Sequence, residues 1–197
     1  MTRIVIATRN KGKVREMQNA FSDLPVELIS LADIDGDIPE AVEDGVTFME
    51  NSLKKARHYQ EMTGMACLAD DSGLEVEALG GAPGVYSARY SGENADDVSN
   101  NAKLVAELRK RGLDSSPAAY QCALTLVDRE GRVLQAQGSC EGVIRLEARG
   151  NGGFGYDPYF YVGDRSMAEL TLSEKDAISH RGEALGKMAV LLKEHWK

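Results

Sequence analysis

Strand-like and helix-like apolar patterns alternate along most of this chain, and that alternation limits the folds open to it more than any other feature. Residues 3–8 are apolar enough for a buried strand, and the next apolar side chains recur at the spacing of one helix face, at Val14, Met17, Phe21 and Leu24. Helices that alternate with strands are typical of α/β layer structures. The pattern therefore predicts an α/β fold with helices packed on a central sheet.

The clearest helix pattern covers residues 48–63. Thr47 and Glu50 have the spacing of a capping box, and Gly64 stands where a helix end favours a left-handed residue. Two further helices are expected, one with the apolar positions Val98, Ala102, Val105 and Leu108, and one near the C-terminus with Leu185, Met188, Ala189, Leu192 and Trp196.

The expected strands indicate a mixed sheet. A short strand at 65–69 is expected to end at Asp70-Asp71-Ser72-Gly73. Residues 120–126 alternate in polarity, and a turn at 128–131 leads to a second run at 133–137, which predicts an antiparallel hairpin. Parallel strands joined through helices, together with one hairpin, give a mixed central β-sheet flanked by helices.

The charge of the chain argues against nucleic acids and anionic membranes as partners. Its 197 residues are about the length of one domain, so residues 1–197 are expected to form a single domain. Lys and Arg number 23 against 31 Asp and Glu, a net charge of −8, which opposes binding to a nucleic-acid backbone or an anionic membrane. An anionic ligand would therefore have to meet a local basic pocket or bring a metal ion.

The cysteines and the apolar runs indicate a cytoplasmic protein. Cys67, Cys122 and Cys140 are too few and too far apart for a disulfide framework or a paired zinc site. The apolar run at 4–7 is shorter than the core of a signal peptide, and no segment approaches the ~20 apolar residues that span a bilayer. A cytoplasmic location is therefore the expectation.

A polar loop after the first strand is a candidate phosphate site. It consists of Thr8-Arg9-Asn10-Lys11-Gly12-Lys13, and a helix is expected to follow it. Unpaired N–H groups and the dipole at a helix N-terminus favour phosphate, and the two lysines add positive charge. The spacing of a Walker loop is absent, so the residues alone leave a solvated polar turn open as the commoner alternative.

Three carboxylates are candidates for a metal site. Glu43 lies in an acidic loop at 33–44, and Asp70 and Asp71 follow a strand. Mg²⁺ usually takes one or two carboxylates together with substrate phosphates and keeps several waters. Successive residues of an extended chain point to opposite sides, so the two aspartates are expected to do different work unless a turn brings them together. Capping of a turn by either aspartate stays an open alternative.

Two clusters in the second half of the chain are candidates for contact with a planar base. One is the glycine-rich loop Gly152-Gly153-Phe154-Gly155-Tyr156-Asp157-Pro158, whose aromatic side chains could stack on a base. The other is Ser179-His180-Arg181 with Lys175 shortly before it, which could hydrogen-bond carbonyl oxygens or neutralise phosphate. Each has an ordinary alternative: a turn whose aromatic residues fill the core, and a solvated helix start.

Together these motifs resemble the inosine triphosphate pyrophosphatase family, and within it the bacterial members that act on dITP and XTP. The resemblance runs nearly end to end. It rests on T-x-N-x-x-K at 8–13, Glu43 ahead of the segment 45–51, and A-D-D-S-G-L at 69–74, with further matches at 80–90, 152–158 and 178–181. Each motif alone is weak, but their shared order and spacing are specific. The resemblance implies a mixed α/β fold with two lobes around a substrate cleft.

The resemblance also implies roles for the matching residues. A triphosphate would be held by Thr8, Arg9, Asn10, Lys11, Gly12 and Lys13, and Mg²⁺ would be bound by Glu43 and Asp71. Substrate would also be contacted by Ser72. The base would be bracketed by Phe154, Gly155, Tyr156 and Asp157, and the nucleotide site would be completed by Lys175, His180 and Arg181. Asp71 would also be the proton acceptor. A carboxylate that donates to a metal is a poorer base, so Asp70 is kept as a second catalytic candidate. Arg9 occupies a position where many members of the family have a small residue.

The activity implied by the resemblance is Mg²⁺-dependent hydrolysis of ITP, dITP or XTP at the α-phosphorus, which yields a nucleoside monophosphate and pyrophosphate. It would clear non-standard purine nucleotides from the pool, and the family is typically a homodimer. Two alternatives stay open: a sensor that binds purine triphosphates without cleaving them, and a related pyrophosphatase for modified pyrimidines or methylated nucleotides. The joint presence of Glu43 and Asp71 favours an enzyme over a sensor.

Overall fold

The strands of the chain form a mixed sheet. They are β1 (Thr2–Ile6), β2 (Val26–Ser30), β3 (Ala66–Val76), β4 (Ser115–Val127), β5 (Val133–Arg145), β6 (Phe160–Val162) and β7 (Arg165–Ser166). Their order in the sheet is β2-β1-β3-β4-β5-β6-β7. β1 pairs in parallel with β2 and β3, whereas β6 pairs antiparallel with β5 and β7. The expected mixed sheet of an α/β fold is thereby confirmed.

The computed structural model describes residues 2–34 and 36–195. Its α-helices are α1 (Lys11–Ala20), α2 (Phe48–Thr63), α3 (Asp97–Lys110), α4 (Leu172–Ile178) and α5 (His180–His195). The chain divides into two compact units, unit 1 with Met1–Asp71, Cys122–Gly138 and Arg181–Lys197, and unit 2 with Ser72–Gln121 and Ser139–His180. The assignment of residues 1–197 to a single domain stays a prediction.

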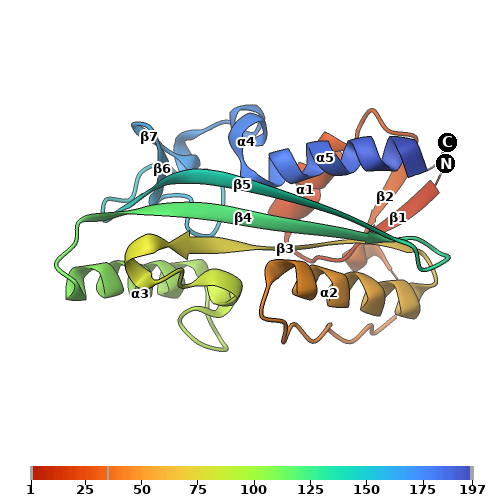
Figure 1. Ribbon diagram of the computed structural model, residues 1–197, viewed down its shortest axis with the longest axis horizontal. Helices are drawn as coiled ribbons and strands as arrows, with labels where there is room; N and C mark the ends of the chain where they lie inside the picture. Colours follow the sequence, from red (N-terminus) through yellow and green to blue (C-terminus); the bar gives the residue numbers. More distant parts are fainter. Residues whose placement is uncertain (1, 35, 196–197) are drawn as a thin grey trace. The chain divides into compact units, whose positions relative to one another are not determined.

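Unit 1 has two apolar layers because the side chains of its strands alternate between the faces of the sheet. Ile4 and Ile6 of β1 belong to a core cluster with buried residues of α1 and α5. Val5 and Ala7 belong to a second cluster with residues of α2. In Figure 1, α1 and α5 accordingly lie on one side of these strands and α2 on the other. The site residues of unit 1 are supplied from both sides.

Unit 2 is organised around a core on which α3 packs. Leu104 and Leu108 of α3 are fully buried, in one cluster with Leu74 and Val76 of β3. The same cluster contains Tyr156 of the glycine-rich loop. The loop is therefore anchored to the interior of this unit by one of its own aromatic side chains.

Strand β3 is longer than the sequence pattern predicted. It runs on through Asp70-Asp71-Ser72-Gly73 to Val76, so the expectation that these polar residues end the strand was wrong. The pairing of β1 with β3 covers only Ala66–Leu68, so the continuation depends on β4, the other neighbour of β3 in the sheet. It also depends on cationic side chains of unit 1 that compensate the buried carboxylates, as described below. Both aspartates lie within the strand and not in a turn.

Other expectations of local structure have mixed outcomes. The α2 helix begins and ends as expected, with the Thr47 capping box and left-handed Gly64. Val98 was placed on the apolar face of α3 but is 77% exposed, and Asn101 is buried instead. α4 was not foreseen, because its seven residues contain no long apolar repeat. Trp196, assigned to the last helix, lies outside the described residues.

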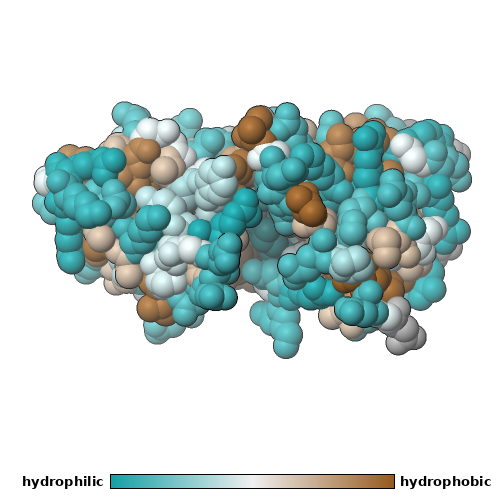
Figure 2. Space-filling model, turned by 90° about the horizontal axis from the view of Figure 1, so that it is seen from below, coloured by the Kyte–Doolittle hydropathy of each residue, from teal (hydrophilic) through white to brown (hydrophobic). Residues whose placement is uncertain are grey.

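The surface fits the charged composition. The face shown in Figure 2 is mostly hydrophilic, with small separate hydrophobic patches. Within residues 2–34 and 36–195, none of the helices is both long enough and apolar enough to pass through a membrane.

Candidate active site

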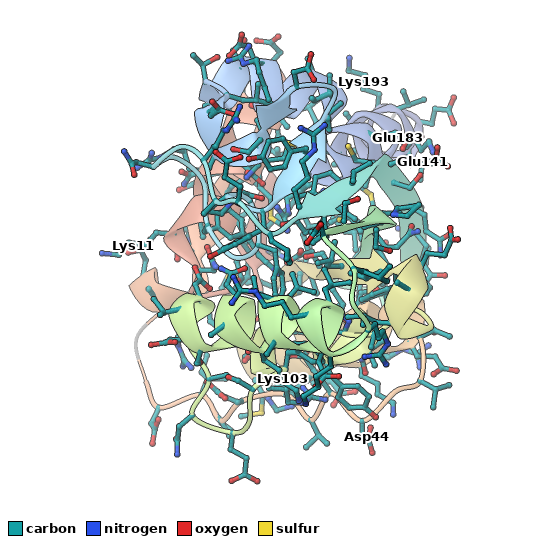
Figure 3. All side chains as sticks on the ribbon, turned by 90° about the vertical axis from the view of Figure 1, so that its left-hand side faces the viewer. Lys11, Asp44, Lys103, Glu141, Glu183 and Lys193 are labelled. Carbon is teal, nitrogen blue, oxygen red and sulfur yellow. The ribbon has the colours of Figure 1, made fainter. Side chains whose placement is uncertain are left out.

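The loop before α1 is held in shape by its own side chains. Asn10 is the N-cap of α1, and its Oδ1 accepts hydrogen bonds from the N–H groups of Gly12 at 2.9 Å and Lys13 at 3.2 Å. Thr8 Oγ1 accepts from the N–H of Asn10 at 3.1 Å. These bonds explain why a hydroxyl and an amide stand at these two positions. The exposed Lys11 points outward from the ribbon in Figure 3.

Arg9 is tied to the acidic segment rather than to the rest of its own loop. Its Nη1 forms an ion pair with Glu40 Oε1 at 3.2 Å, and its Nη2 donates to the carbonyl of Ile38 at 3.4 Å. Both partners of the ion pair are well exposed, so the pair adds little stability. A contact of Arg9 with phosphate stays a prediction.

Asp70 is the centre of a buried ion network in unit 1. Its Oδ2 lies 3.1 Å from Lys13 Nζ and 3.2 Å from Arg181 Nη2, and Arg181 Nη1 lies 2.5 Å from Glu16 Oε2. Burial disfavours the charge of Asp70, but Lys13, Arg181 and Lys55 outweigh it and hold the pKa of Asp70 well below its usual range. Asp70 is therefore a permanent anion, unsuited to accept a proton.

Asp71 has the opposite electrostatic character. Burial raises its pKa to about 6, although Lys55 and a hydrogen bond from the Asn51 side chain oppose the rise, and Glu43 adds to it. Its Oδ2 is buried without a hydrogen-bond partner among the described residues. A carboxylate whose pKa lies near neutrality is suited to exchange protons at physiological pH.

The two neighbouring aspartates have different surroundings because they lie on opposite faces of β3. Asp70 contacts Lys13 of α1 and Arg181 of α5, on one side of the sheet. Asp71 interacts with Asn51 of α2, on the other side. The alternation of side chains along an extended strand predicts this separation.

Lys55 links the acidic loop to the strand. Its Nζ lies 2.9 Å from Glu43 Oε2 and donates to the carbonyl of Asp70 at 3.1 Å. Burial disfavours its charge, but Asp70, Glu43 and other acidic contacts outweigh burial and raise the pKa of Lys55. Lys55 is therefore an ammonium ion beside Asp71, and it holds Glu43 in place.

The sequence motifs predicted no role for Lys55, Asn51 or Glu16. Asn51 and Lys55 are four residues apart on α2, the spacing that places two side chains on one helix face, and Asn51 is buried. Glu16 lies three residues after Lys13 on α1 and is also buried. These residues could have been found in the sequence as polar residues that lie at helical spacing from a motif.

The donor set fits a hard divalent cation that substrate helps to bind. Glu43 and Asp71 supply carboxylate oxygens, and the unpartnered Asp71 Oδ2 is a ready ligand atom. Among the described residues, no group of three or more His, Cys, Asp or Glu side chains is arranged to hold a metal. Two carboxylates completed by phosphate oxygens and water are what Mg²⁺ commonly uses.

In unit 2, Asp157 gathers the residues expected to contact a base. Its Oδ2 accepts from Lys175 Nζ at 2.9 Å and from the Phe154 N–H at 3.0 Å, and its Oδ1 accepts from Tyr120 Oη at 3.1 Å. Lys175 Nζ lies 4.4 Å from the centre of the half-buried Phe154 ring. The His180 ring stacks on Tyr120 with centroids 4.7 Å apart. A buried carboxylate thus positions an aromatic ring, a cation and an imidazole.

The remaining predicted residues have separate surroundings. Tyr156 is 5% exposed, and its hydroxyl donates to the carbonyl of Ser87 at 2.7 Å, which favours a core role. Ser72 is half-buried in unit 2, directly after Asp71 of unit 1. Arg181 lies in unit 1, and its nearest acidic partners are Glu16 and Asp70. Contacts of these three residues with substrate stay predictions.

Replacing Gly153 with alanine is expected to displace the Asp157 carboxylate. Gly153 has φ +69°, and an added Cβ would collide with Asp157 Oδ2 and Cγ. Gly163→Ala is the matched control, because Gly163 has φ +63° but open space around a Cβ. We expect both variants to lose about 1 kcal/mol of unfolding free energy to backbone strain, with a further ~1–3 kcal/mol lost in Gly153→Ala alone. Thermal unfolding of the two variants measures the difference, and equal losses would contradict this account.

Comparisons with known proteins find relatives that match this chain over nearly its full length. The model of the Ham1 family matches residues 4–191. A dITP/XTP pyrophosphatase from Geobacter sulfurreducens is 53% identical over 197 residues, covering 99% of this chain and 96% of its own. One from Desulforamulus reducens is 48% identical over 192 residues, covering 96% of this chain and 95% of its own.

Solved structures agree. A HAM1 protein from Coxiella burnetii superimposes with a TM-score of 0.88 at 42% identity, covering 98% of this chain and all of that one. The Ham1 protein from Staphylococcus aureus gives a TM-score of 0.83 at 36% identity, with the same coverage. The resemblance drawn from the motifs is thus confirmed over nearly the full length. This chain belongs to the Ham1 family.

Proposed function

We propose that this protein hydrolyses non-standard purine nucleoside triphosphates, dITP, XTP and ITP, to the monophosphate and pyrophosphate, with Mg²⁺ as cofactor. The curated relatives carry the name dITP/XTP pyrophosphatase, which supports the substrate class. The observation that carries the chemistry is Asp71, a buried carboxylate whose pKa is raised to about 6 and which has an unpartnered oxygen beside Glu43 and Lys55. We place the activity in the cytoplasm, as a homodimer.

The residues of unit 1 suit the triphosphate. A triphosphate carries about four negative charges, and Lys11 and Lys13 at the start of α1 offer ammonium groups with the helix dipole behind them. Asp70 keeps Lys13 in position through their 3.1 Å ion pair. These local positive charges would allow an acidic protein to bind a polyanion.

Asp71 is the proton acceptor in this proposal. Asp70 is held ionised by Lys13 and Arg181, so its affinity for a proton is too low for the task, whereas the pKa of Asp71 is close to neutrality. Bound Mg²⁺, held by Glu43 and Asp71, would offset the charge that develops on the leaving pyrophosphate. Lys55 keeps Glu43 oriented and supplies a further positive charge.

The residues of unit 2 suit the base. Phe154 offers a ring for stacking, and Lys175 and His180 offer donors that could meet the 6-oxo group of hypoxanthine or xanthine. Adenine has an amino group at that position and would leave such donors unpaired, which can discriminate by ~10⁴ or more. We assign Arg181 instead to holding Asp70, because Asp70 and Glu16 already engage its guanidinium.

Product analysis tests the proposal. The protein is incubated with ITP, XTP, dITP, ATP and GTP, each with Mg²⁺ and with EDTA, and pyrophosphate is separated from orthophosphate. We expect pyrophosphate from the first three nucleotides, little turnover of ATP and GTP, and loss of activity with EDTA. Orthophosphate as the first product would exclude cleavage at the α-phosphorus. Tight ITP binding without turnover would indicate a sensor.

A further inference from the structure

Both polar backbone groups of Gly155 are held by side chains of α3. The Gly155 N–H donates to Asp97 Oδ2 at 2.8 Å, and the Gly155 carbonyl accepts from Asn101 Nδ2 at 2.9 Å. Asp97 and Asn101 are four residues apart on α3, so they project from one face of the helix. All three residues belong to unit 2.

These two bonds fix the peptide planes on either side of one flexible residue. The Gly155 N–H belongs to the peptide that links it to Phe154, and its carbonyl belongs to the peptide that links it to Tyr156. Gly155 has φ +63°, and no atom lies within 4 Å of an added Cβ, so side-chain packing does not restrict it. Glycine has the widest backbone freedom of any residue. The conformation of the loop at Gly155 therefore depends strongly on α3.

The Oδ1 atom of Asn101 makes no hydrogen bond within the described part of the chain that would stabilise the fold. It is 8% exposed, and its Oδ1 is buried without a hydrogen-bond partner among the described residues. An unsatisfied buried acceptor destabilises a protein, so a leucine of similar size would serve the core of unit 2 as well or better. The structural benefit visible for the asparagine is its bond to Gly155.

The neighbouring loop residues have partners outside α3. Phe154 is held through its N–H by Asp157, and Tyr156 through its hydroxyl by Ser87. Gly155 lies between them, and its hydrogen bonds to Asp97 and Asn101 involve only its backbone groups. Release of Gly155 would therefore loosen the Phe154 ring without undoing the core.

We propose that Asp97 and Asn101 are positioning residues for base binding, because they fix Gly155 and thereby the Phe154 ring before substrate arrives. This inference rests on the proposed function only in assigning the base to Phe154. A loop ordered in advance loses less conformational entropy on binding, so the pair should lower KM and leave kcat nearly unchanged once substrate is bound.

The first test uses the exposed member of the pair. In Asp97→Ala we expect KM for ITP to rise about fivefold and kcat to stay within about twofold, because one charge-assisted hydrogen bond is lost. Asp97→Asn keeps an acceptor oxygen and should restore KM to within about twofold of the wild-type value. Val98→Ala, at a 77% exposed neighbour on the same helix, is the matched control and should leave both constants unchanged.

The second variant removes the other bond. Asn101→Leu deletes both the donor to Gly155 and the unsatisfied Oδ1, so we expect about a tenfold rise in KM with little change in the unfolding midpoint. Unchanged KM in both Asp97→Ala and Asn101→Leu would overturn the proposal. So would a fall in kcat alone, or a failure of Asp97→Asn to rescue, because these would indicate structural or charge effects.

Amide hydrogen exchange separates this proposal from the proposed function. In ligand-free protein, Asp97→Ala and Asn101→Leu should accelerate exchange in the segment 153–157, while Val98→Ala should not. If the wild-type protein fails to hydrolyse ITP, the proposed function fails, and the exchange rates still decide whether α3 orders the loop. Wild-type exchange rates in both variants would refute the positioning role.

Discussion

Asp71→Asn is expected to abolish turnover and, at the same time, to make the metal-free protein more stable. Loss of the proton acceptor and of one proposed metal ligand should lower kcat by at least about 10³-fold. The stability gain follows from the pKa of Asp71, which rises from 3.8 to about 6 on folding. At about 1.4 kcal/mol per pKa unit, the ionised carboxylate destabilises the fold by about 3 kcal/mol at neutral pH, and a neutral amide avoids that penalty.

The same shift fixes the direction of a pH effect. Because burial raises the folded pKa of Asp71 above its unfolded value of 3.8, folding favours the protonated carboxyl group. The stabilising contribution of protonation is fully present below about pH 4 and is lost as the pH rises through about 6. The stability advantage of Asp71→Asn over wild type should therefore be largest above about pH 7 and should shrink as the pH falls. Urea unfolding in EDTA at several pH values measures it.

Asp70→Asn is the matched control, since it makes the same change at the neighbouring residue. The pKa of Asp70 is held low, so its charge stabilises the fold, and its loss leaves Lys13 and Arg181 with one carboxylate fewer. We expect Asp70→Asn to lose about 3–5 kcal/mol of unfolding free energy. If both variants changed the unfolding free energy in the same direction, the different electrostatic roles assigned to Asp70 and Asp71 would be wrong. Near-normal turnover by Asp71→Asn would contradict the role of Asp71 as proton acceptor.

Much of the fold could be predicted from the sequence because local chemistry decides it. The capping box at Thr47 and the glycine at 64 set both ends of α2, and the polarity of residues 120–137 marks the hairpin. The length of β3 could not be predicted, because Asp-Asp-Ser-Gly has the composition of a turn. These residues are kept extended by β4, which neighbours β3 in the sheet, and by compensating cations, all of which come from distant parts of the chain.

The candidate site was predictable to a similar extent. Motifs of the family selected Asp71, Glu43 and the polar loop as candidates, and their roles stay predictions. Strand geometry alone predicted that Asp70 and Asp71 have different surroundings, which the structure shows. The supporting residues were not visible in this way. Lys55, Glu16 and Asp97 look like ordinary solvated helix residues in sequence, and their tasks depend on which distant partner each one meets.

Arg181→Met is expected to destabilise the protein by about 3–5 kcal/mol, because it removes the cation from two buried carboxylates. Arg181 is 2% exposed, and its guanidinium lies 2.5 Å from Glu16 and 3.2 Å from Asp70. For a chain of this length, each kcal/mol corresponds to roughly 2–4 °C, so the unfolding midpoint should fall by about 10 °C. Thermal unfolding followed by circular dichroism measures the shift.

A double variant shows whether the loss comes from the Glu16 carboxylate. Asp70 retains Lys13 as a partner when Arg181 is replaced, whereas Glu16 has lost its guanidinium partner. Glu16→Gln should therefore restore more than half of the stability lost in Arg181→Met, even though Glu16→Gln alone is destabilising. A different result would support a role for Arg181 in binding the nucleotide. An unchanged midpoint in Arg181→Met, combined with altered preference between ITP and ATP, would mean that its guanidinium recognises the base and that its bonds to Glu16 and Asp70 are exchanged when substrate binds.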